Sequence, residues 1–243
     1  MNKLPDRPAS HDVAAFLARV NSLPAVRPAA GRAGRLLFAI DATASRQPTW
    51  DRACGLTADM FAAVKQVGGL AVSLAYYRGY GELAATPFLT DAAEITRRMG
   101  GVTCLGGQTQ IGRVLAHALN EHRKERIAAL VFIGDAVEED IDQLAHKAGE
   151  MGMLDLKGFF FHEGGDPVAG NAFRQLARLS GGAYVPFDLS SGAQLRALLE
   201  AVAVYAAGGR QALAALAARD RGAASIAGQL PAPSSGPASA GRR

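Results

Sequence analysis

Apolar and polar residues alternate along the chain in blocks that predict strands and helices in turn. Mostly apolar runs lie at 36–40, 70–77, 127–133, 156–161 and 183–187, and several of them are continuously apolar, as is typical of strands that are buried on both faces. Segments with helical spacing lie between them, at 50–67, 91–99, 109–123, 138–151, 169–179 and 195–205. The pattern predicts an α/β fold with a doubly wound, mostly parallel central sheet that helices flank on both faces.

One strand of the pattern is weaker than the others. The segment 83–89 contains Pro87, which has no backbone N–H to donate to a neighbouring strand. We therefore expect this segment at the edge of the sheet, as its one antiparallel strand.

The ends of the chain differ from its middle. Residues 1–34 form an N-terminal extension in which Ser10 is expected to cap a short helix with Val13, Phe16, Leu17 and Val20 on its apolar side. The folded domain is expected to cover 35–207. Residues 208–243 are rich in Ala, Gly and Pro, and after a short helical extension at 212–219 we expect a disordered tail from Gly222 on.

The net charge also differs between the ends of the chain and its middle, and this difference bears on which functions the domain can have. The net charge is +4, but residues 1–34 carry +3 and 208–243 carry +4, which leaves −3 for the domain. A mildly acidic domain argues against a nucleic-acid-binding core. No apolar run is long enough to span a membrane, and no signal-peptide pattern follows Met1. The two cysteines, Cys54 and Cys104, have no metal or redox spacing, so we expect a cytoplasmic chain with reduced thiols.

Polar side chains with candidate chemistry follow two of the apolar strands. Asp41, Thr43 and Ser45 come directly after the first strand, and Asp135 comes directly after the strand at 127–133. In open α/β sheets, ligands bind at the carboxyl ends of the strands. Carboxylate and hydroxyl oxygens are hard ligands of the kind that Mg²⁺ prefers. The alternative is that these residues only cap the helices that follow them.

Three segments of the sequence together resemble the von Willebrand factor A (VWA) domain family. Residues Asp41 to Ser45 resemble its Asp-x-Ser-x-Ser motif, the loop 106–112 with Thr109 resembles its second element, and Ile133-Gly134-Asp135 is similar to its third. The resemblance covers roughly 35–207 and implies a Rossmann-like VWA fold with a metal-ion-dependent adhesion site (MIDAS).

The resemblance also implies a role for each site residue. Thr43 and Ser45 would bind Mg²⁺ through their hydroxyls, Asp41 and Asp135 would bind it directly or through water, and Thr109 would do either in different states. Mn²⁺ and Ca²⁺ are alternative occupants. The open sixth position would take an Asp or Glu of a protein partner, because a metal with few carboxylate ligands keeps positive charge.

The sequence departs from the family pattern at three places. Thr43 replaces a Ser, and Ala136-Val137 stands where the family often has Gly. The acidic run Glu138-Glu139-Asp140 then follows, and we interpret it as favourable charge at a helix N-terminus. The alternative is that this run raises metal affinity or repels acidic partners.

Two further readings of the site remain. A Mg²⁺-dependent phosphatase with Asp41 as nucleophile would need a second acid at position 43, where this chain has Thr. A metal-free scaffold would make the ligand set coincidental. Outside the motifs, we expect Trp50 in the core rather than at an interface, the tyrosines at 76, 77 and 80 near the rim of the site, and the run from His162 to Asp166 as a loop.

Overall fold

The central feature of the molecule is a six-stranded sheet. The computed structural model describes residues 33–48, 50, 51, 69–187 and 192–231. The strands are β1 (Gly34–Asp41), β2 (Leu70–Arg78), β3 (Glu82–Ala85), β4 (Ala129–Gly134), β5 (Lys157–Glu163) and β6 (Ala183–Phe187). Their spatial order is β3-β2-β1-β4-β5-β6, and every neighbouring pair is parallel except β2 and β3. The predicted parallel sheet with one antiparallel edge strand is confirmed.

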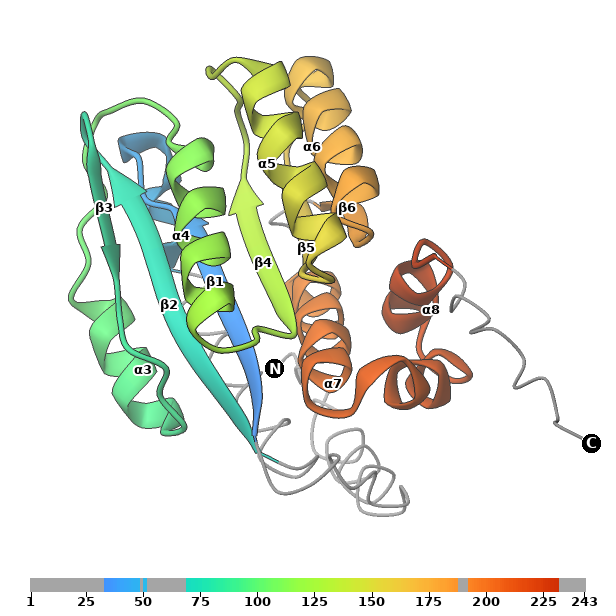
Figure 1. Cartoon of the computed structure of the whole chain (residues 1–243). Helices are drawn as coiled ribbons and strands as arrows, with labels where there is room; N and C mark the ends of the chain where they lie inside the picture. The colour runs from blue at the N-terminus through green and yellow to red at the C-terminus, as the bar shows by residue number, and fades with distance from the viewer. Residues whose placement is uncertain (1–32, 49, 52–68, 188–191, 232–243) are drawn as a thin grey trace, which may run out of the picture.

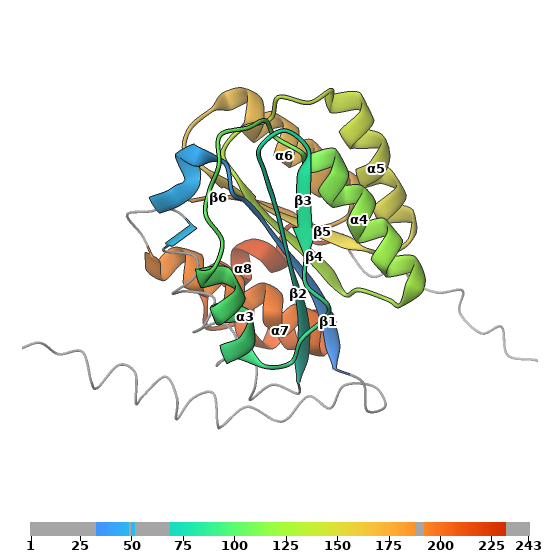
Figure 2. The ribbon, with the colours of Figure 1, turned by 90° about the vertical axis from the view of Figure 1, so that its left-hand side faces the viewer.

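Helices cover both faces of this sheet (Figures 1 and 2). They are η2 (Ala44–Arg46), α3 (Ala92–Gly100), α4 (Ile111–Lys124), α5 (Ile141–Met153), α6 (Pro167–Leu179), α7 (Gly192–Ala217) and α8 (Arg221–Ala227). Buried residues of α4, α5 and α6 share one apolar cluster with the sheet, whereas those of α3, α7 and α8 share the cluster on its other face. The predicted doubly wound architecture is therefore also confirmed.

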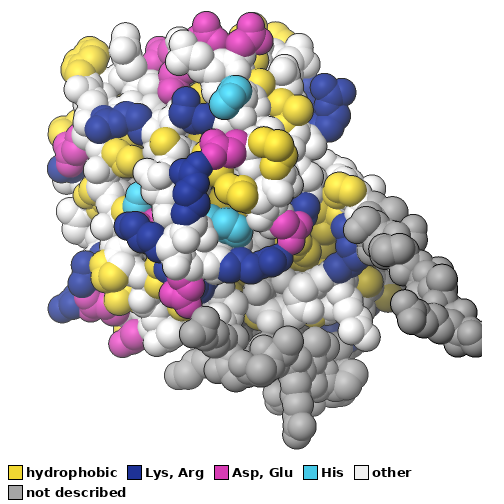
Figure 3. Space-filling view, viewed as in Figure 1, with side chains coloured by type: hydrophobic (Ala, Val, Ile, Leu, Met, Phe, Trp, Pro, Cys, Tyr) yellow, Lys and Arg dark blue, Asp and Glu magenta, His cyan; other side chains and the backbone are white. Residues whose placement is uncertain are grey.

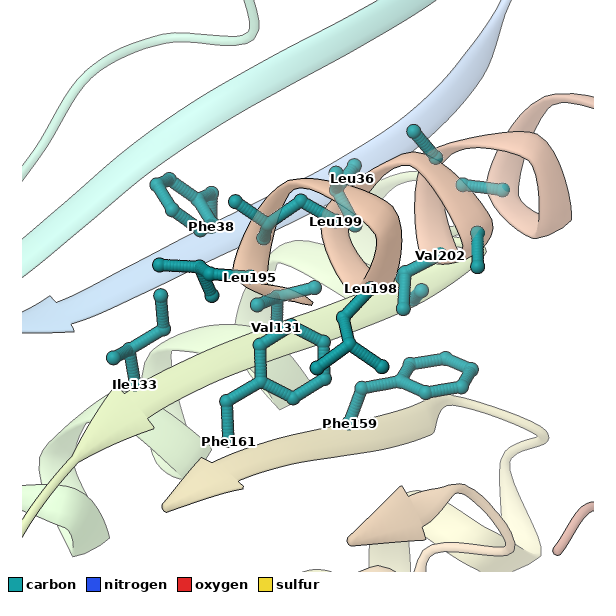
Figure 4. Close-up of a cluster of buried hydrophobic side chains, with 14 of the residues drawn as sticks. Leu36, Phe38, Val131, Ile133, Phe159, Phe161, Leu195, Leu198, Leu199 and Val202 are labelled. Carbon is teal, nitrogen blue, oxygen red and sulfur yellow. The ribbon is translucent and has the colours of Figure 1, made fainter. Parts of the chain in front are cut away.

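The two central strands are buried because both of their faces are covered. All six residues of β4 are buried, as are the last six of β1. On the α7 side, Leu195, Leu198, Leu199 and Val202 pack over strand residues of β1, β4 and β5 (Figure 4). Burial of large apolar side chains on each face contributes about 1.5–3 kcal/mol per residue, and this fixes the positions of the strand ends.

The lone tryptophan belongs to this core, as expected. Trp50 is 1% exposed, and its indole N–H donates to the Met99 carbonyl at 3.1 Å. Its ring also meets the Tyr76 ring edge-on. Of the three tyrosines, Tyr77 is buried, Tyr76 is partly buried and only Tyr80 is strongly exposed, so only Tyr80 is available to a partner.

The edge strand is shorter than the sequence suggests. β3 ends at Ala85, and Pro87 separates it from Leu89, which forms an isolated antiparallel bridge with Val72. Beside Pro87, the Thr86 hydroxyl accepts from the Leu74 N–H and the Thr86 carbonyl accepts from the Ser73 hydroxyl, so side chains take part where the ladder is interrupted.

The C-terminal part of the chain corrects our expectation. We expected disorder from Gly222 on, but Asp220 caps α8 by accepting from the Ala223 N–H, and Ala223, Ile226 and Leu230 are buried in the α7-side core. The expected helical extension at 212–219 is the end of α7, beyond a kink at Gly209 (φ +68°). The expected domain boundary at 207 lies just before this kink, and the N-terminal helix, most of the helix at 50–67 and the expected tail at 232–243 lie outside the described residues.

The strand order places Asp41, at the end of β1, and Asp135, after β4, on the two sides of the topological switch point of the sheet. The chain leaves β1 for β2 on one side, whereas β4, β5 and β6 lie on the other. Ile40 of β1 pairs with Ile133 of β4, so Asp41 lies beside the start of the segment that follows β4. Ligand sites of doubly wound folds form at this position.

Within the described residues, no helix has the length and apolar character needed to cross a membrane.

Candidate metal centre

A cleft of about 210 Å³ opens at the carboxyl ends of β1 and β4. Its walls come from the end of β1, the loop before α4 and the segment after β4. The lining residues are Asp41, Thr43, Ala44, Gly106, Gly107, Thr109, Asp135, Ala136 and Glu138. Four of the five residues that the sequence predicts as metal ligands therefore lie together, although they are up to 94 positions apart in the chain.

Asp41 is the most deeply buried acid of the cleft, with 1% of its surface exposed. Its Oδ1 accepts a hydrogen bond from the Thr43 N–H at 2.8 Å. Burial raises the pKa of the Asp41 carboxyl, while the hydrogen bonds from Thr43 and the charge of Arg46 act in the opposite direction. A buried carboxylate of this kind gains from any cation that binds beside it.

Tyr77 lies next to Asp41 in the register of β1 and β2. Its side chain is fully buried, and its hydroxyl has no hydrogen-bond partner among the described residues. Burial and the charge of Asp41 raise the pKa of Tyr77 well above its usual value. The Tyr77 hydroxyl therefore faces the Asp41 carboxylate, where a water could bridge the two groups.

Thr43 links the end of β1 to the loop that closes the cleft. It forms an isolated parallel bridge with Leu105, and the Leu105 N–H donates to the Ala42 carbonyl at 3.0 Å. The Thr43 carbonyl accepts from the Arg46 N–H at 2.9 Å, which starts η2. Ser45 belongs to η2, but its side chain is outside what the structure describes, so its predicted role stays a prediction.

Thr109 is held by a reciprocal pair of hydrogen bonds with Glu138. Its N–H donates to the Glu138 carboxylate at 2.9 Å, and its hydroxyl accepts from the Glu138 N–H at 3.0 Å. The Thr109 oxygen keeps a second lone pair, which remains usable by a ligand in the cleft. This pair fixes the loop before α4 against the segment that follows β4.

Close packing of glycines positions the same loop from its other side. A Cβ atom on Gly107 would lie 2.1 Å from the Gly79 carbonyl oxygen, so only glycine fits there. The Gln108 N–H donates to that oxygen at 3.3 Å. Gly79 and Gly81 have positive φ values of +58° and +109°, and they flank the exposed Tyr80.

Asp135 has a partner that the sequence reasoning did not anticipate. Its Oδ2 lies 3.5 Å from Nη1 of Arg46, and the same nitrogen also contacts the Glu163 carboxylate. The Arg46 side chain is 3% exposed, whereas the Asp135 side chain is 33% exposed and lines the cleft. Arg46 directly follows the first motif in sequence, but only the fold shows that it turns toward the end of β4.

The three acidic residues after β4 bind three different parts of the chain. Asp140 caps α5 by accepting from the Gln143 N–H, so α5 begins at Ile141 and not at Glu138 as expected. Glu139 accepts from the N–H groups of Ile111 and Gly112 at the start of α4, at 2.5 and 2.8 Å. Our interpretation as charge at a helix N-terminus holds for both, although Glu139 serves a different helix. Glu138 lines the cleft.

The segment from His162 to Asp166 is only partly a loop. β5 continues to Glu163, and His162 is 2% exposed with its Nδ1 3.0 Å from the Tyr184 hydroxyl.

Among the described residues, no group of three or more His, Cys, Asp and Glu side chains is arranged to hold a metal ion. A metal centre in this cleft would use hydroxyl oxygens beside the carboxylates.

The donor set of the cleft meets that requirement. Asp41 and Asp135 offer carboxylate oxygens, and Thr43 and Thr109 offer hydroxyl oxygens, without a nitrogen or sulfur ligand. Such a set suits a hard divalent cation such as Mg²⁺, which keeps several waters and needs few carboxylates. The residues present fit the metal that the sequence motifs imply.

Comparison with solved structures places the fold among VWA domains. The chain is similar to the VWA domain of SpRpn10, with a TM-score of 0.54 and 12% identity over 68% of this chain and 95% of that one. It is also similar to the vWF domain of the pilus tip protein Mfa5 from Porphyromonas gingivalis, with a TM-score of 0.56 and 11% identity over 72% and 95%. Proximal thread matrix protein 1 from the mussel byssus, in a structure with a zinc-occupied MIDAS motif, has a TM-score of 0.55 and 15% identity over 70% and 45%.

The fold of this chain is the VWA fold, as its three sequence motifs suggested. No model of a protein family matches the sequence, and no curated protein does. At these identities the likeness concerns the fold alone.

Proposed function

We propose that this protein is a divalent-metal-dependent protein-binding module. In the proposed site, Thr43, Ser45 and Thr109 contribute hydroxyls to Mg²⁺, and Asp41 and Asp135 bind it directly or through water. An Asp or Glu of a partner protein completes the coordination. The observation that carries the proposal is the cleft at the β1–β4 switch point, lined by four of these five residues in a chain with the VWA fold.

The charge around the cleft supports a metal-dependent mode of capture. Acidic side chains gather at the end of the molecule where the strands terminate (Figure 3). Glu138, Asp140 and Asp166 are exposed at the segments that follow β4 and β5. A partner carboxylate is repelled by this surface unless a bound cation reverses the local charge. Mn²⁺ and Ca²⁺ are alternative cations, and the cytoplasm remains the compartment that we propose.

Two exposed apolar side chains near the cleft are candidates for partner contacts. Tyr80 is 86% exposed, in the turn that packs against the Gly106–Gly107 loop, and Leu105 is 44% exposed beside Thr43. Tyrosines at the rim of a buried contact often contribute strongly to binding. The favoured partner therefore presents an acid with an apolar neighbour.

The proposal can be tested by titrating the protein with Mn²⁺ and following the free ion by electron paramagnetic resonance. The wild type should bind one ion, and Asp41→Asn combined with Asp135→Asn should bind at least about tenfold more weakly. Asp166→Asn is the matched control, because Asp166 caps α6 and does not line the cleft. Equal affinity of the double variant and the wild type would exclude the site.

Capture of a partner forms the second half of the test. Proteins retained by the immobilised wild type in Mg²⁺ should be lost after addition of EDTA and should be absent with Asp41→Asn. A partner that is retained under both conditions would mean that the module binds without its metal.

The phosphatase hypothesis remains the alternative. Asp41 is buried beside a Tyr and a Thr, and position 43 offers no carboxyl group to protonate a leaving group. Turnover of a chromogenic phosphate ester with Mg²⁺ that depends on Asp41 would reverse this ranking.

A further inference from the structure

The most unusual polar group outside the predicted ligand set is the guanidinium of Arg46. It is buried in η2, one residue after the first motif, and its Nη1 contacts two carboxylates at once. Arginine is almost never fully buried unless it is paired. Its partners come from the ends of two neighbouring strands, Asp135 after β4 and Glu163 at the end of β5.

The two carboxylates do not share Arg46 equally. Glu163 is in close contact with Nη1, whereas Asp135 lies 3.5 Å away and has a side chain that is 33% exposed to the cleft. The Nε and Nη2 atoms of Arg46 are buried without a hydrogen-bond partner among the described residues. Within the described residues, the two acids therefore hold the guanidinium through Nη1.

We propose that Arg46 and Glu163 form a counter-charge pair that sets how strongly Asp135 holds the metal. The positive charge of Arg46 partly neutralises the Asp135 carboxylate. Glu163 limits this effect because it binds the same guanidinium. The inference depends on the proposed metal site and assigns two positioning residues to it, neither of which is a ligand.

The arrangement has a physical consequence for binding. A carboxylate that is partly neutralised by arginine gives less charge to a metal, so the metal binds more weakly but keeps more positive charge for an external acid. Arg46 would therefore lower the affinity of the site for the metal and raise the affinity of the bound metal for an acid of the partner. Removal of Arg46 and removal of Glu163 should shift metal affinity in opposite directions.

The first test measures Mn²⁺ affinity for single variants of the full chain. Arg46→Gln should bind Mn²⁺ about tenfold more tightly than the wild type, and Glu163→Gln about tenfold more weakly. Arg46→Lys keeps the charge and should lie close to the wild type. Arg113→Gln is the control, because this arginine contacts Gly81 beside the loop but does not contact Asp135. A residue that only supports the fold would weaken binding in both variants, and that result would overturn the inference.

Combined variants test whether the effect passes through Asp135. In an Asp135→Asn background, Arg46→Gln should change Mn²⁺ affinity by much less than in the wild type. In an Arg46→Gln background, Glu163→Gln should change Mn²⁺ affinity by much less than it does in the wild type. Full additivity in both cycles would mean that the charges act on the metal from a distance, and the proposed pair would be wrong.

Acetate provides a probe of the open coordination position. Its binding to Mn²⁺-loaded protein can be followed by water proton relaxation, because acetate displaces a coordinated water. Arg46→Gln should weaken acetate binding while it tightens Mn²⁺ binding. Parallel changes in both affinities would overturn the inference. A wild type that binds no Mn²⁺ would instead remove the proposed function itself, so the two failures are distinguishable.

Discussion

At the scale of single residues, Gly107 shows how backbone packing positions the metal loop. A Cβ atom at this position would overlap the Gly79 carbonyl group, with distances of 2.1 Å to its oxygen and 2.4 Å to its carbon. Gly107→Ala must therefore separate the loop from the turn at Gly79, at a cost of about 1–3 kcal/mol. We expect denaturant unfolding to show this loss and Mn²⁺ binding to weaken at least about tenfold, because Thr109 moves with the loop.

Gly106→Ala is the control for that substitution. A Cβ atom on Gly106 meets no atom within 4 Å, although this residue also lines the cleft. Its variant should match the wild type in stability and in Mn²⁺ affinity. Similar losses in both variants would mean that the loop needs glycine for its flexibility and not for its packing.

His117 in α4 predicts a pH dependence of stability. Its Nε2 is buried without a hydrogen-bond partner in the described part of the chain, and burial lowers the pKa of the imidazole below 6.5. The unfolded state therefore binds a proton more readily than the folded state. The contribution of His117 to stability is complete above the unfolded pKa and is lost as the pH falls below about 6.5.

Guanidinium unfolding at pH 7.5 and 5.5 checks this expectation. The wild type should lose more stability between the two pH values than His117→Gln does, because the variant has no imidazole to protonate. Identical losses in the two proteins would show that His117 does not contribute to the acid sensitivity.

At the scale of elements, the sequence predicted the parts of the fold that depend on continuous burial. The runs that became β1, β2, β4, β5 and β6 are apolar at most positions and short, as expected of strands that are covered on both faces. The start of α5 was misplaced by three residues, because Glu138 and Glu139 bind the loop and helix on the other side of the cleft. Such long-range hydrogen bonds leave no local pattern in the sequence.

In the candidate site, too, the residues that local sequence patterns mark could be predicted, and those that depend on long-range contacts could not. Asp41 and Asp135 could be placed because strand ends mark them, whereas Thr109 was assigned through the resemblance of its loop to the VWA family. Arg46 could not be assigned, because its partners Asp135 and Glu163 are more than 85 positions away and only the sheet order brings them close.

Helix α8 is the element that the sequence concealed most completely. Its buried positions are few and mostly small, and the surrounding Ala, Gly and Ser are typical of a disordered tail. Ile226 is fully buried in the core on the α7 side, so Ile226→Ala should destabilise the protein by about 2–4 kcal/mol. Thermal and denaturant unfolding measure this loss.

Ser225→Ala provides the matched substitution in the same helix. Ser225 is exposed, and its backbone carbonyl accepts from the Gln229 side chain, an interaction that the substitution keeps. Its stability should remain within about 0.5 kcal/mol of the wild type. An Ile226→Ala variant as stable as Ser225→Ala would mean that α8 does not belong to the folded unit.

At the scale of the whole molecule, the proposed metal connects three segments that the fold already holds together. The Leu105 N–H binds the Ala42 carbonyl, Thr109 and Glu138 exchange hydrogen bonds, and Arg46 contacts Asp135. A bound cation adds a link among these segments and raises the free energy of opening any one of them. β6 lies at the far edge of the sheet, and α8 packs on α7 and β6, so neither contacts the cleft.

Amide hydrogen exchange with and without Mg²⁺ should therefore show a local pattern of protection. Peptides covering 41–46, 105–111 and 134–139 should exchange more slowly in Mg²⁺, whereas peptides covering 183–187 and 221–227 should exchange at the same rate. Asp41→Asn should abolish the difference without changing exchange in the two control regions, because it removes one metal contact and leaves the cores on both faces intact. Protection spread evenly over the sheet, or strongest in α8, would place the cation elsewhere and would separate the VWA fold of this chain from a metal-dependent role at the β1–β4 cleft.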